Sequence, residues 1–336
     1  MSLDIRFCRL DEVSKLQAFI REEWSADHIF VYSNALLEYQ HRSRTDNSYN
    51  FAVAVDGQGK FNAILGFIPP GHFGDAADDA LWLSLWKTGK NCTDKGAGLA
   101  LLKFLEKNIS HDAIITAGIS AQAKLIYKAL RFQVQTLQHH YLAINVRSSG
   151  LSEGLRSREN FATDNQVPLM PGAMDHLMVG GAADSIGYRC RSAEYFVQKY
   201  ERHPLYDYQV MHAPACDITL VFRVAEVQGL GRAMRIIDCG GNIKEFSRLS
   251  EAIEATARRA EVEYVDLLAH WPSSDAVAKA GFHAVQDEVL PNYFEPFVKK
   301  NVAIEFAVKN RNALDTWVFK GDGDQDRPSR IKGINA

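Results

Sequence analysis

The feature that most constrains the fold is a strand–helix–strand pattern that occurs twice, 150 positions apart. Residues 112–116 align with 262–266, and both stretches are apolar enough for a buried strand. Residues 127–132 align with 277–282, and each ends a predicted helix at a phenylalanine that begins the next strand. A repeat of this length predicts two halves of similar architecture. Because the identity between the halves is low, two unrelated strand–helix–strand units remain the alternative.

The length of the chain agrees with two domains. A chain of 336 residues exceeds the size at which single hydrophobic cores stop growing, roughly 250–300 residues. Hydrophobic residues make up 46% of the sequence and charged residues 24%, as in ordinary globular proteins. We expect a mixed α/β (α+β) fold with tandem domains at residues 1–146 and 188–336. Residues 147–187, rich in Ser, Gly, Asn and Asp, form a connector or an insertion.

Hydrophobic periodicity predicts alternating strands and helices in the first half. Helices are expected at 11–23, 33–42, 96–107 and 121–130. Strands are expected at 5–9, 51–55, 62–68, 80–86 and 113–117, followed by a closing pair at 132–135 and 139–145. Strict alternation in the strand 80–86 predicts one face with Leu81, Leu83 and Leu85 and another with Trp82, Ser84 and Trp86. The predicted elements of the second half end in the same order of strands and helices as those of the first half.

The charge balance argues against a nucleic-acid or membrane partner. Lys and Arg number 38 against 41 Asp and Glu, so the net charge of −3 gives no overall basic field. No run of 18 apolar residues occurs, and the N-terminus lacks the charged-then-apolar pattern of a secretory signal. We therefore expect a cytoplasmic protein with no nucleic-acid partner and no membrane insertion.

Neither the cysteines nor the C-terminal aspartates form a metal-binding pattern. The cysteines are scattered and never form a C-x-x-C pair, which favours reduced thiols over disulfides or a zinc ribbon. They are Cys8, Cys92, Cys190, Cys216 and Cys239. Asp322, Asp324 and Asp326 alternate as in a calcium loop, but Arg327 stands where such a loop needs glycine. We expect a terminal turn with Asp–Arg pairs, and no metal.

The strongest chemical signal is the junction between the strand 80–86 and the helix 96–107, which contains Gly96, Ala97 and Gly98. Small residues in the first turn of a helix let a ligand approach the backbone, and the first amides of a helix bind phosphate groups. The dinucleotide fingerprint G-x-G-x-x-G is not met, because Leu101 stands at its third glycine. The junction therefore predicts a pyrophosphate site of another type.

The element order, the Gly96-x-Gly98 pattern and the step from Tyr127 to Phe132 resemble the GNAT superfamily of acyl-CoA N-acyltransferases, over roughly residues 4–145. In that family the pattern Gln/Arg-x-x-Gly-x-Gly/Ala wraps the coenzyme A pyrophosphate, and a tyrosine on the next helix stands beside the thiol. The chain departs from the family at Thr93, in place of Gln or Arg, and at Arg131, in place of glycine.

The resemblance implies acetyl-CoA or another acyl-CoA as co-substrate. The implied binding residues are Leu85, Trp86, Lys87, Thr93, Asp94, Lys95, Gly96, Ala97, Gly98 and Leu99. Backbone amides near Leu85–Lys87 are candidates to stabilise the oxyanion of the thioester. Tyr127 is the candidate acid for the departing thiolate, with packing of its ring on the sheet as the alternative. Asp27 and His28 are candidate bases; their alternatives are loop ordering or capping, and deprotonation through water.

The second half looks like a degenerate copy of the first. Residues 246–248, Phe-Ser-Arg, stand opposite Gly96-Ala97-Gly98, and Val277 stands opposite Tyr127, so we expect a single donor site. An aromatic segment bearing Tyr195, Tyr206 and Tyr208 suits sugar recognition. Filling of the core between the domains is the alternative.

We expect an N-acyltransferase that transfers acetyl or another non-aminoacyl group to a small amine. Segments 24–29, 83–87, 195–208 and 321–328 resemble GNAT-like proteins of bacterial surface-polysaccharide synthesis. That resemblance implies an amino sugar, free or nucleotide-linked, as acceptor. The alternatives are a Fem-type peptidyltransferase that uses aminoacyl-tRNA and a non-catalytic glycan- or partner-binding protein. A homodimer is compatible with the sequence.

Overall fold

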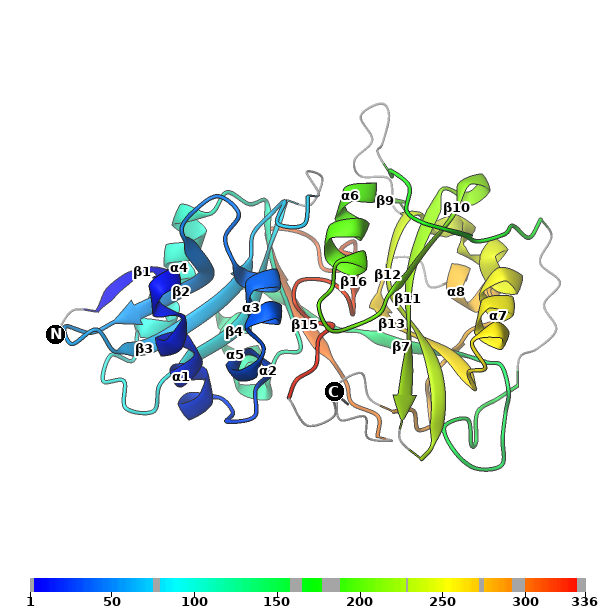
Figure 1. Ribbon diagram of the computed structural model, residues 1–336, viewed down its shortest axis with the longest axis horizontal. Coiled ribbons are helices and arrows are strands. Elements are labelled where there is room, and N and C mark those ends of the chain that lie inside the picture. The colour runs from blue at the N-terminus through cyan, green and yellow to red at the C-terminus, as the bar shows by residue number, and fades with distance from the viewer. Residues whose placement is uncertain are drawn as a thin grey trace.

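The computed structural model describes residues 3–74, 79–157, 165–176, 188–227, 229–271, 275–291 and 300–330. Two mixed β-sheets stand next to each other, one in each half of the molecule, and helices cover them (Figure 1). The expected mixed α/β fold is confirmed. Among the described helices, none combines the length and apolar character needed to cross a membrane. All five cysteines are free thiols, as expected.

The first sheet contains strands from both ends of the chain. In spatial order they are β1 (Asp4–Arg9), β2 (Ser48–Val55), β3 (Phe61–Ile68), β4 (Ala80–Thr88), β5 (Ala113–Ala117), β15 (Glu305–Lys309) and β6 (Gln133–Thr136). β4 and β5 run parallel, and the other neighbours are antiparallel.

The strands of the second sheet show the same order of parallel and antiparallel neighbours as those of the first. Its strands are β8 (Met170–Pro171), β10 (Gln209–Ala213), β11 (Ile218–Val227), β12 (Gly231–Asn242), β13 (Tyr264–His270), β7 (Gln138–Ala143) and β14 (His283–Ala284). β12 and β13 run parallel, and the other neighbours are antiparallel. β9 (Tyr188–Arg189) pairs with the end of β12 outside this path. β12 and β13 therefore correspond to β4 and β5, as the internal repeat predicts.

The two halves exchange one strand each. β15 lies between β5 and β6 in the first sheet, whereas β7 lies between β13 and β14 in the second. Figure 1 shows the orange β15 among the strands of the first half and the teal β7 reaching the second. The prediction that 132–135 and 139–145 pair with each other is therefore wrong. Periodicity identifies strands but not their partners, and here distant strands supply the hydrogen bonds. Residues 1–146 lack one strand of the first sheet, β15, and residues 188–336 lack two strands of the second, β7 and the two-residue β8.

The repeat extends to the ends of two helices. α5 (Ala121–Ala129) is followed by Arg131 at φ 64°, and α8 (Asp275–Lys279) by Gly281 at φ 87°. In both halves the next residue, a phenylalanine, donates its amide to the carbonyl five positions back, at 2.9 Å in the first half and 3.3 Å in the second. A left-handed residue commonly ends a helix in this way, and glycine is the usual choice. Arg131 takes the same conformation despite its side chain.

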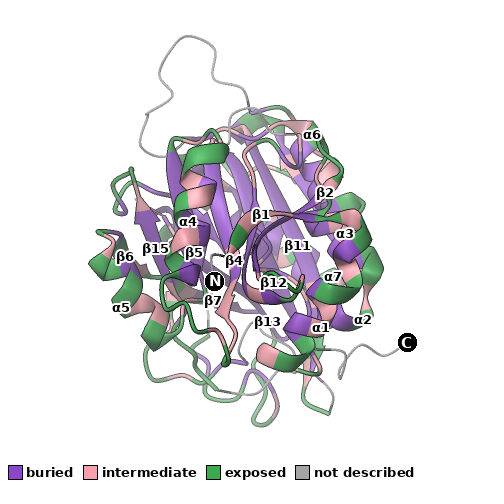
Figure 2. Cartoon of the chain, turned by 90° about the vertical axis from the view of Figure 1, so that its left-hand side faces the viewer, coloured by how far each residue is buried: buried purple, intermediate pink, exposed green. Residues whose placement is uncertain are grey.

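Helices cover both faces of the first sheet. α1 (Val13–Glu23), α2 (Ile29–Tyr32) and α3 (Asn34–His41) pack on one face, and α4 (Ala97–Asn108) packs with α5 on the other. Figure 2 shows buried strands beneath helices whose outer faces are exposed. Candidate residues on α2 and on α5 are therefore separated by the sheet.

In the second half, α7 (Ser250–Arg259) and α8 pack on one face of the sheet. The short helix α6 (Ala193–Phe196) lies between the halves, where Phe196 belongs to a cluster that includes Trp82 of the first sheet and Leu268 of the second. This shared apolar cluster joins the halves into one core.

A β-bulge in β4 changes which side chains share a face. β3 pairs Leu65 with Trp86 but Phe67 with Leu83, so β4 carries one extra residue between these pairs. Leu83 packs on the α4 side, whereas Leu85 packs with α1 and α3. The predicted alternation is therefore wrong after Leu83, and Trp86 joins the α4 face.

The C-terminal segment 318–327 closes the gap between β12 and β13. β16 (Val318–Phe319) pairs with the end of β13. The amide of Lys320 then donates to the carbonyl of Leu268 on β13 at 3.2 Å. The amide of Gly321 donates to Ile237 on β12 at 2.9 Å. One stretch of chain thus bridges two strands that have stopped pairing with each other.

The aspartates of this segment are buried and paired with arginines. The pairs are Asp322 with Arg189, Asp324 with Arg327 at 3.3 Å, and Asp326 with Arg223 at 2.9 Å. The predicted Asp–Arg pairing is confirmed, and two of the partners come from distant parts of the second half. Burial alone would raise the pKa of Asp326, but the charges of Arg223 and Lys320 and the hydrogen bonds from Arg223 and Tyr208 together lower that pKa to about 2.

We predict that Asp326→Ala lowers the free energy of unfolding by about 3–5 kcal/mol, because it leaves the Arg223 guanidinium buried without its carboxylate. The exposed Asp207 is the matched control, and Asp207→Ala should change stability by less than about 0.5 kcal/mol. Urea denaturation followed by circular dichroism measures both. Equal stability of the two variants would contradict the role given to this pair.

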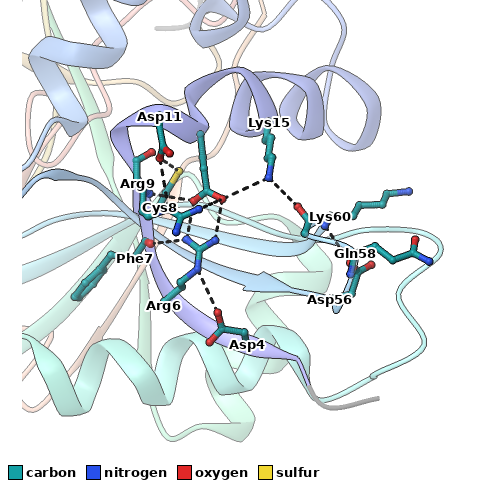
Figure 3. Close-up of polar contacts among 12 residues, drawn as sticks. Asp4, Arg6, Phe7, Cys8, Arg9, Asp11, Lys15, Asp56, Gln58 and Lys60 are labelled. Atoms are coloured by element: carbon teal, nitrogen blue, oxygen red, sulfur yellow. Dashed lines mark hydrogen bonds and ion pairs between the residues drawn. The ribbon is translucent and has the colours of Figure 1, made fainter.

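A second polar cluster holds β1 to the start of α1. Arg6, Arg9 and Lys15 gather there around the carboxylate of Glu12, which is 2% exposed (Figure 3). Arg6 donates to both oxygens of Glu12, at 2.7 and 2.8 Å. These hydrogen bonds from Arg6 lower the pKa of Glu12 to about 2.

Because the pKa of Glu12 is lowered from 4.5 in the folded state, its stabilising effect should be complete above pH ~4.5 and lost as the pH falls towards 2. Over that range the wild-type protein should lose about 3 kcal/mol relative to Glu12→Gln, whose amide does not titrate. The exposed neighbour Asp11 provides the control, and Asp11→Asn should follow the wild-type profile. Parallel stability profiles for wild type and Glu12→Gln would contradict the prediction.

Candidate functional site

The candidate donor site lies where β4 runs on beyond β5. The two strands pair from Ala80 with Ala113 to Leu83 with Thr116, and β4 then continues to Thr88. α4 begins after the loop 89–96. The end of β4 and the first turn of α4 therefore border a place where the sheet has opened.

Backbone amides define the first turn of α4. Gly96 is the N-cap residue, and its amide donates to the Asp94 carboxylate at 2.8 Å. The amides of Gly98 and Leu99 lie in the first turn, where a helix offers them no carbonyl four residues earlier. Thr93, Asp94 and the neighbouring Lys95 are exposed, as the loop of an anion site must be. These groups fit a phosphate if the exposed Asp94 side chain turns away.

Trp86 stands between this turn and α5. Its Nε1 donates to the carbonyl of Gly98 at 3.2 Å, and its ring centroid lies 5.4 Å from that of Tyr127. A Cβ added to Gly98 would lie 3.0 Å from Thr88 Oγ1 and 3.2 Å from Trp86 Nε1. Glycine at this position therefore permits the close contact of α4 with β4. A ligand that follows β4 into the opening has to displace the half-buried indole of Trp86.

Tyr127 is 2% exposed and packs against Trp86 and Phe132. Its hydroxyl makes a hydrogen bond with Thr116 on β5, and burial raises its pKa. Packing on the sheet, one of the two predicted roles, is observed. The contact with Trp86 also places the ring near the end of β4, and the role as an acid stays a prediction.

His28 and Asp27 lie away from Tyr127, on the α1–α3 side of the first sheet. His28 is the N-cap residue of α2, and its Nδ1 accepts from Phe30 N at 3.2 Å. The imidazole is 4% exposed, and burial lowers its pKa to about 3. The capping role predicted as the alternative is observed. The structure does not bring His28 or the half-buried Asp27 to Tyr127.

Comparison with known proteins identifies the fold. No protein-family model matches the sequence, and no curated protein matches it. Among solved structures, a GCN5-related N-acetyltransferase from Anabaena variabilis is similar at 11% identity and a TM-score of 0.52, over 91% of this chain and 72% of that one. An Enterococcus faecalis protein described as a probable N-acyltransferase is similar at 6% identity and a TM-score of 0.52, over 92% of this chain and 72% of the other. The chain has the GNAT fold.

In the second half of this GNAT-fold chain, the opening that corresponds to the candidate donor site is closed. The equivalents of Gly96 and Gly98 lie in a 3₁₀ helix, Ile243–Leu249, where Phe246 is fully buried. The segment 318–327 bonds to both β12 and β13, as described above. The chain itself therefore fills the space that a donor would need at this position.

The aromatic segment fills the core between the halves. Tyr195 and Tyr208 are 2% and 8% exposed, and their hydroxyls donate to Asp238 and Asp326 at 2.7 and 2.6 Å. Tyr206 is half-buried under the Arg223 guanidinium, 4.3 Å from its ring centroid. For Tyr195 and Tyr208 the structural alternative to sugar recognition is therefore the one observed.

Sequence reasoning missed an acidic group beside β4. Ser84, at the bulge, donates to the carboxylate of Asp324, and His41 Nε2 lies 3.5 Å from the same carboxylate. Asp324 comes from the C-terminal segment, 240 positions from Ser84. No local pattern connects such residues. The alternation of Asp322, Asp324 and Asp326 and the family resemblance of segment 321–328 marked the segment, but neither pointed to Ser84 or His41.

Proposed function

We propose that this chain is an acyl-CoA-dependent N-acyltransferase that binds one donor, in its first half. One observation carries the proposal. β4 contains a bulge and continues beyond the end of its pairing with β5, and the first turn of α4 and Tyr127 lie beside the opening that this leaves. A donor lying along β4 would place its pyrophosphate at the amides of Gly98 and Leu99. The closed opening in the second half supports a single site.

The remaining donor contacts come from the loop and the strand end. Leu85, Trp86 and Lys87 supply backbone groups along the donor, and Lys95 supplies positive charge near the phosphates. Thr93, Asp94, Gly96 and Ala97 form the loop, with Asp94 rotating off the amide of Gly96. The donor brings the activated thioester, and the protein orients it against β4.

Two groups of this chain serve the transfer itself. Backbone amides near Leu85–Lys87 stabilise the negative charge on the thioester oxygen as the amine attacks. Tyr127 gives its proton to the departing thiolate and is reprotonated from water. The amine releases its own proton to water. His28 shapes the α1–α2 loop by capping α2.

The acceptor is a small primary amine, and an amino sugar or a nucleotide-linked amino sugar is the class that we favour. The resemblance described for segments 24–29, 83–87, 195–208 and 321–328 supports this choice. A peptidyltransferase that uses aminoacyl-tRNA and a non-catalytic binding protein are the competing outcomes of the experiments below.

We predict that acetyl-CoA binds to one site per chain in isothermal titration calorimetry. Gly98→Val should weaken binding by about tenfold or more, because the added side chain would collide with Thr88 and Trp86 and displace the first turn of α4 from the end of β4. Arg248→Ala, at the equivalent position of the second half, is the matched control and should bind as wild type. Displacement of the indole should change tryptophan fluorescence in wild type and much less in Trp86→Phe.

Circular dichroism melts of both variants show whether lost binding reflects lost folding. Two equivalent sites, or unchanged affinity in folded Gly98→Val, would refute the placement of the donor. No binding of acetyl-CoA by the wild-type protein would refute the proposed function.

We predict that Tyr127→Phe lowers kcat by about 100-fold and leaves the Kd for acetyl-CoA unchanged, because the hydroxyl acts only in the transition state. Thiol release is measured with the primary amine that an acceptor screen shows to be fastest. Thr116→Val is the control: it removes the hydroxyl's partner but keeps the acid, so its effect should be smaller. Unchanged kcat in Tyr127→Phe would assign the residue to packing.

A further inference from the structure

The C-terminal segment also lies against the first sheet, beside the opening between β4 and β5. Figure 1 shows this segment, in red, between the two halves. A Cβ added to Gly323 would lie 3.3 Å from the Cβ of Trp82 on β4. A Cβ added to Gly118, directly after β5, would lie 3.1 Å from Oε1 of Gln325. The segment therefore reaches from β4 to the end of β5.

Ser84 is the first residue of β4 beyond its pairing with β5, which ends at Leu83 and Thr116. Leu83 packs on the α4 side of the sheet. Ser84 faces the α3 side, where its hydroxyl donates to Asp324 and where His41 of α3 contacts the same carboxylate. Ser84 is partly exposed, whereas Asp324 is 2% exposed. The serine therefore stands between a buried carboxylate and the opening.

The carboxylate of Asp324 fixes the direction of two polar groups. Its Oδ2 accepts the hydroxyl proton of Ser84, and its Oδ1 accepts from Nε2 of Gln325 at 3.1 Å. Because a carboxylate only accepts, Ser84 gives it its one proton and Gln325 turns its NH₂ group towards it. The lone pairs of Ser84 Oγ and Gln325 Oε1 are left as acceptors, and no described residue donates to either oxygen.

The charge on Asp324 is held by its neighbours. Burial alone would raise the pKa of Asp324, but the charge of Arg327 and the contacts with His41 and Ser84 hold that pKa well below its usual range. Such a carboxylate is too weak a base to take a proton from an amine. It stays ionised near neutral pH, however, and keeps the oxygens of Ser84 and Gln325 in their role as acceptors. Asp324 is therefore a positioning residue.

These two acceptors lie across the sheet from Tyr127. The hydroxyl of Tyr127 bonds to Thr116, the last residue of β5 that pairs with β4, from the α5 side. Ser84 follows the partner of Thr116 and faces the other side. In an acyl transfer the attacking nitrogen and the leaving sulfur meet at one carbon. A thioester carbon at this level of the opening would have the acid on one face of the sheet and the two acceptors on the other.

We propose that Ser84 Oγ and Gln325 Oε1 accept hydrogen bonds from the two N–H groups of the attacking amine, so that the protein prefers primary to secondary amines. The inference rests on the proposed function for the reaction itself. The nitrogen directs its lone pair at the thioester carbon, and its N–H groups are left for the two oxygens. The C–N bond forms, the C–S bond breaks, the thiolate takes the proton of Tyr127, and the nitrogen loses one proton to water.

The test uses the full chain with acetyl-CoA and two nucleophiles that are largely uncharged near neutral pH. Methoxyamine has two N–H groups, and N,O-dimethylhydroxylamine has one. Thiol release gives kcat/KM for each, divided by the rate constant of its uncatalysed reaction with acetyl-CoA. We expect the wild-type protein to prefer methoxyamine by about tenfold on this scale, because the secondary amine forms one hydrogen bond fewer.

Ser84→Ala and Gln325→Leu should each lower kcat/KM for methoxyamine by about tenfold and leave the Kd for acetyl-CoA unchanged. The preference for methoxyamine should largely disappear in both variants, because one acceptor remains and one N–H group suffices for it. Ser84→Thr keeps the hydroxyl and should keep the preference. The matched control is Ser329→Ala, where the same segment meets the start of α2, and it should act as wild type.

A purely structural role would lower the melting temperature of Ser84→Ala and leave the preference for methoxyamine unchanged, and that result would overturn the proposal. A wild-type protein that binds acetyl-CoA but does not accelerate its reaction with methoxyamine would overturn it too. Failure of the wild-type protein to bind acetyl-CoA would refute the proposed function, and the amine site with it. Calorimetry with acetyl-CoA alone therefore separates the two failures.

Discussion

The hydrogen bonds of Lys320 and Gly321 to β13 and β12 are the interaction on which the asymmetry of the molecule depends. Both sheets contain a parallel pair whose longer strand runs on past its partner. In the second sheet the C-terminal segment occupies the opening and satisfies backbone groups of both strands. In the first sheet the same segment contacts β4, where Ser84 donates a hydrogen bond to the carboxylate of Asp324. Two similar halves thus differ in whether the chain itself fills the opening between their parallel strands.

The strand exchange explains why the halves are not independent. β15 completes the first sheet from the C-terminal part of the chain, and β7 completes the second from the N-terminal part. Removing the second half would expose the edges of β5 and β6. Removing the first half would expose the edges of β13 and β14. Unpaired edges of this kind carry unsatisfied backbone groups.

The sequence predicted local structure well and long-range pairing poorly. The limits of β5 and the cap at Ser33 followed from local periodicity and capping chemistry, which depend on neighbouring residues. The exchange of β7 and β15 depends on which distant strand supplies hydrogen bonds, and alternation is the same for every partner. The bulge that turns Trp86 towards Tyr127 could not be predicted from the sequence either, because one extra residue in a strand does not change the composition of the segment. At the site, sequence reasoning identified the junction at Gly98 but not the indole that fills it.

The aspartates alone would not fix the C-terminal segment in one register. Because they recur at every second position, a shift of the segment by two residues would again offer a carboxylate to two of the three sites. Gly321 and Gly323 prevent this. A Cβ at Gly321 would lie 2.8 Å from Ile237 Cγ2, and Gly323 adopts φ 58°, a conformation that side chains disfavour. A shift by two residues would place Gln325 at the position of Gly323 in one direction, or Phe319 at the position of Gly321 in the other. The glycines therefore fix the register, and the ion pairs neutralise the charges that this register buries.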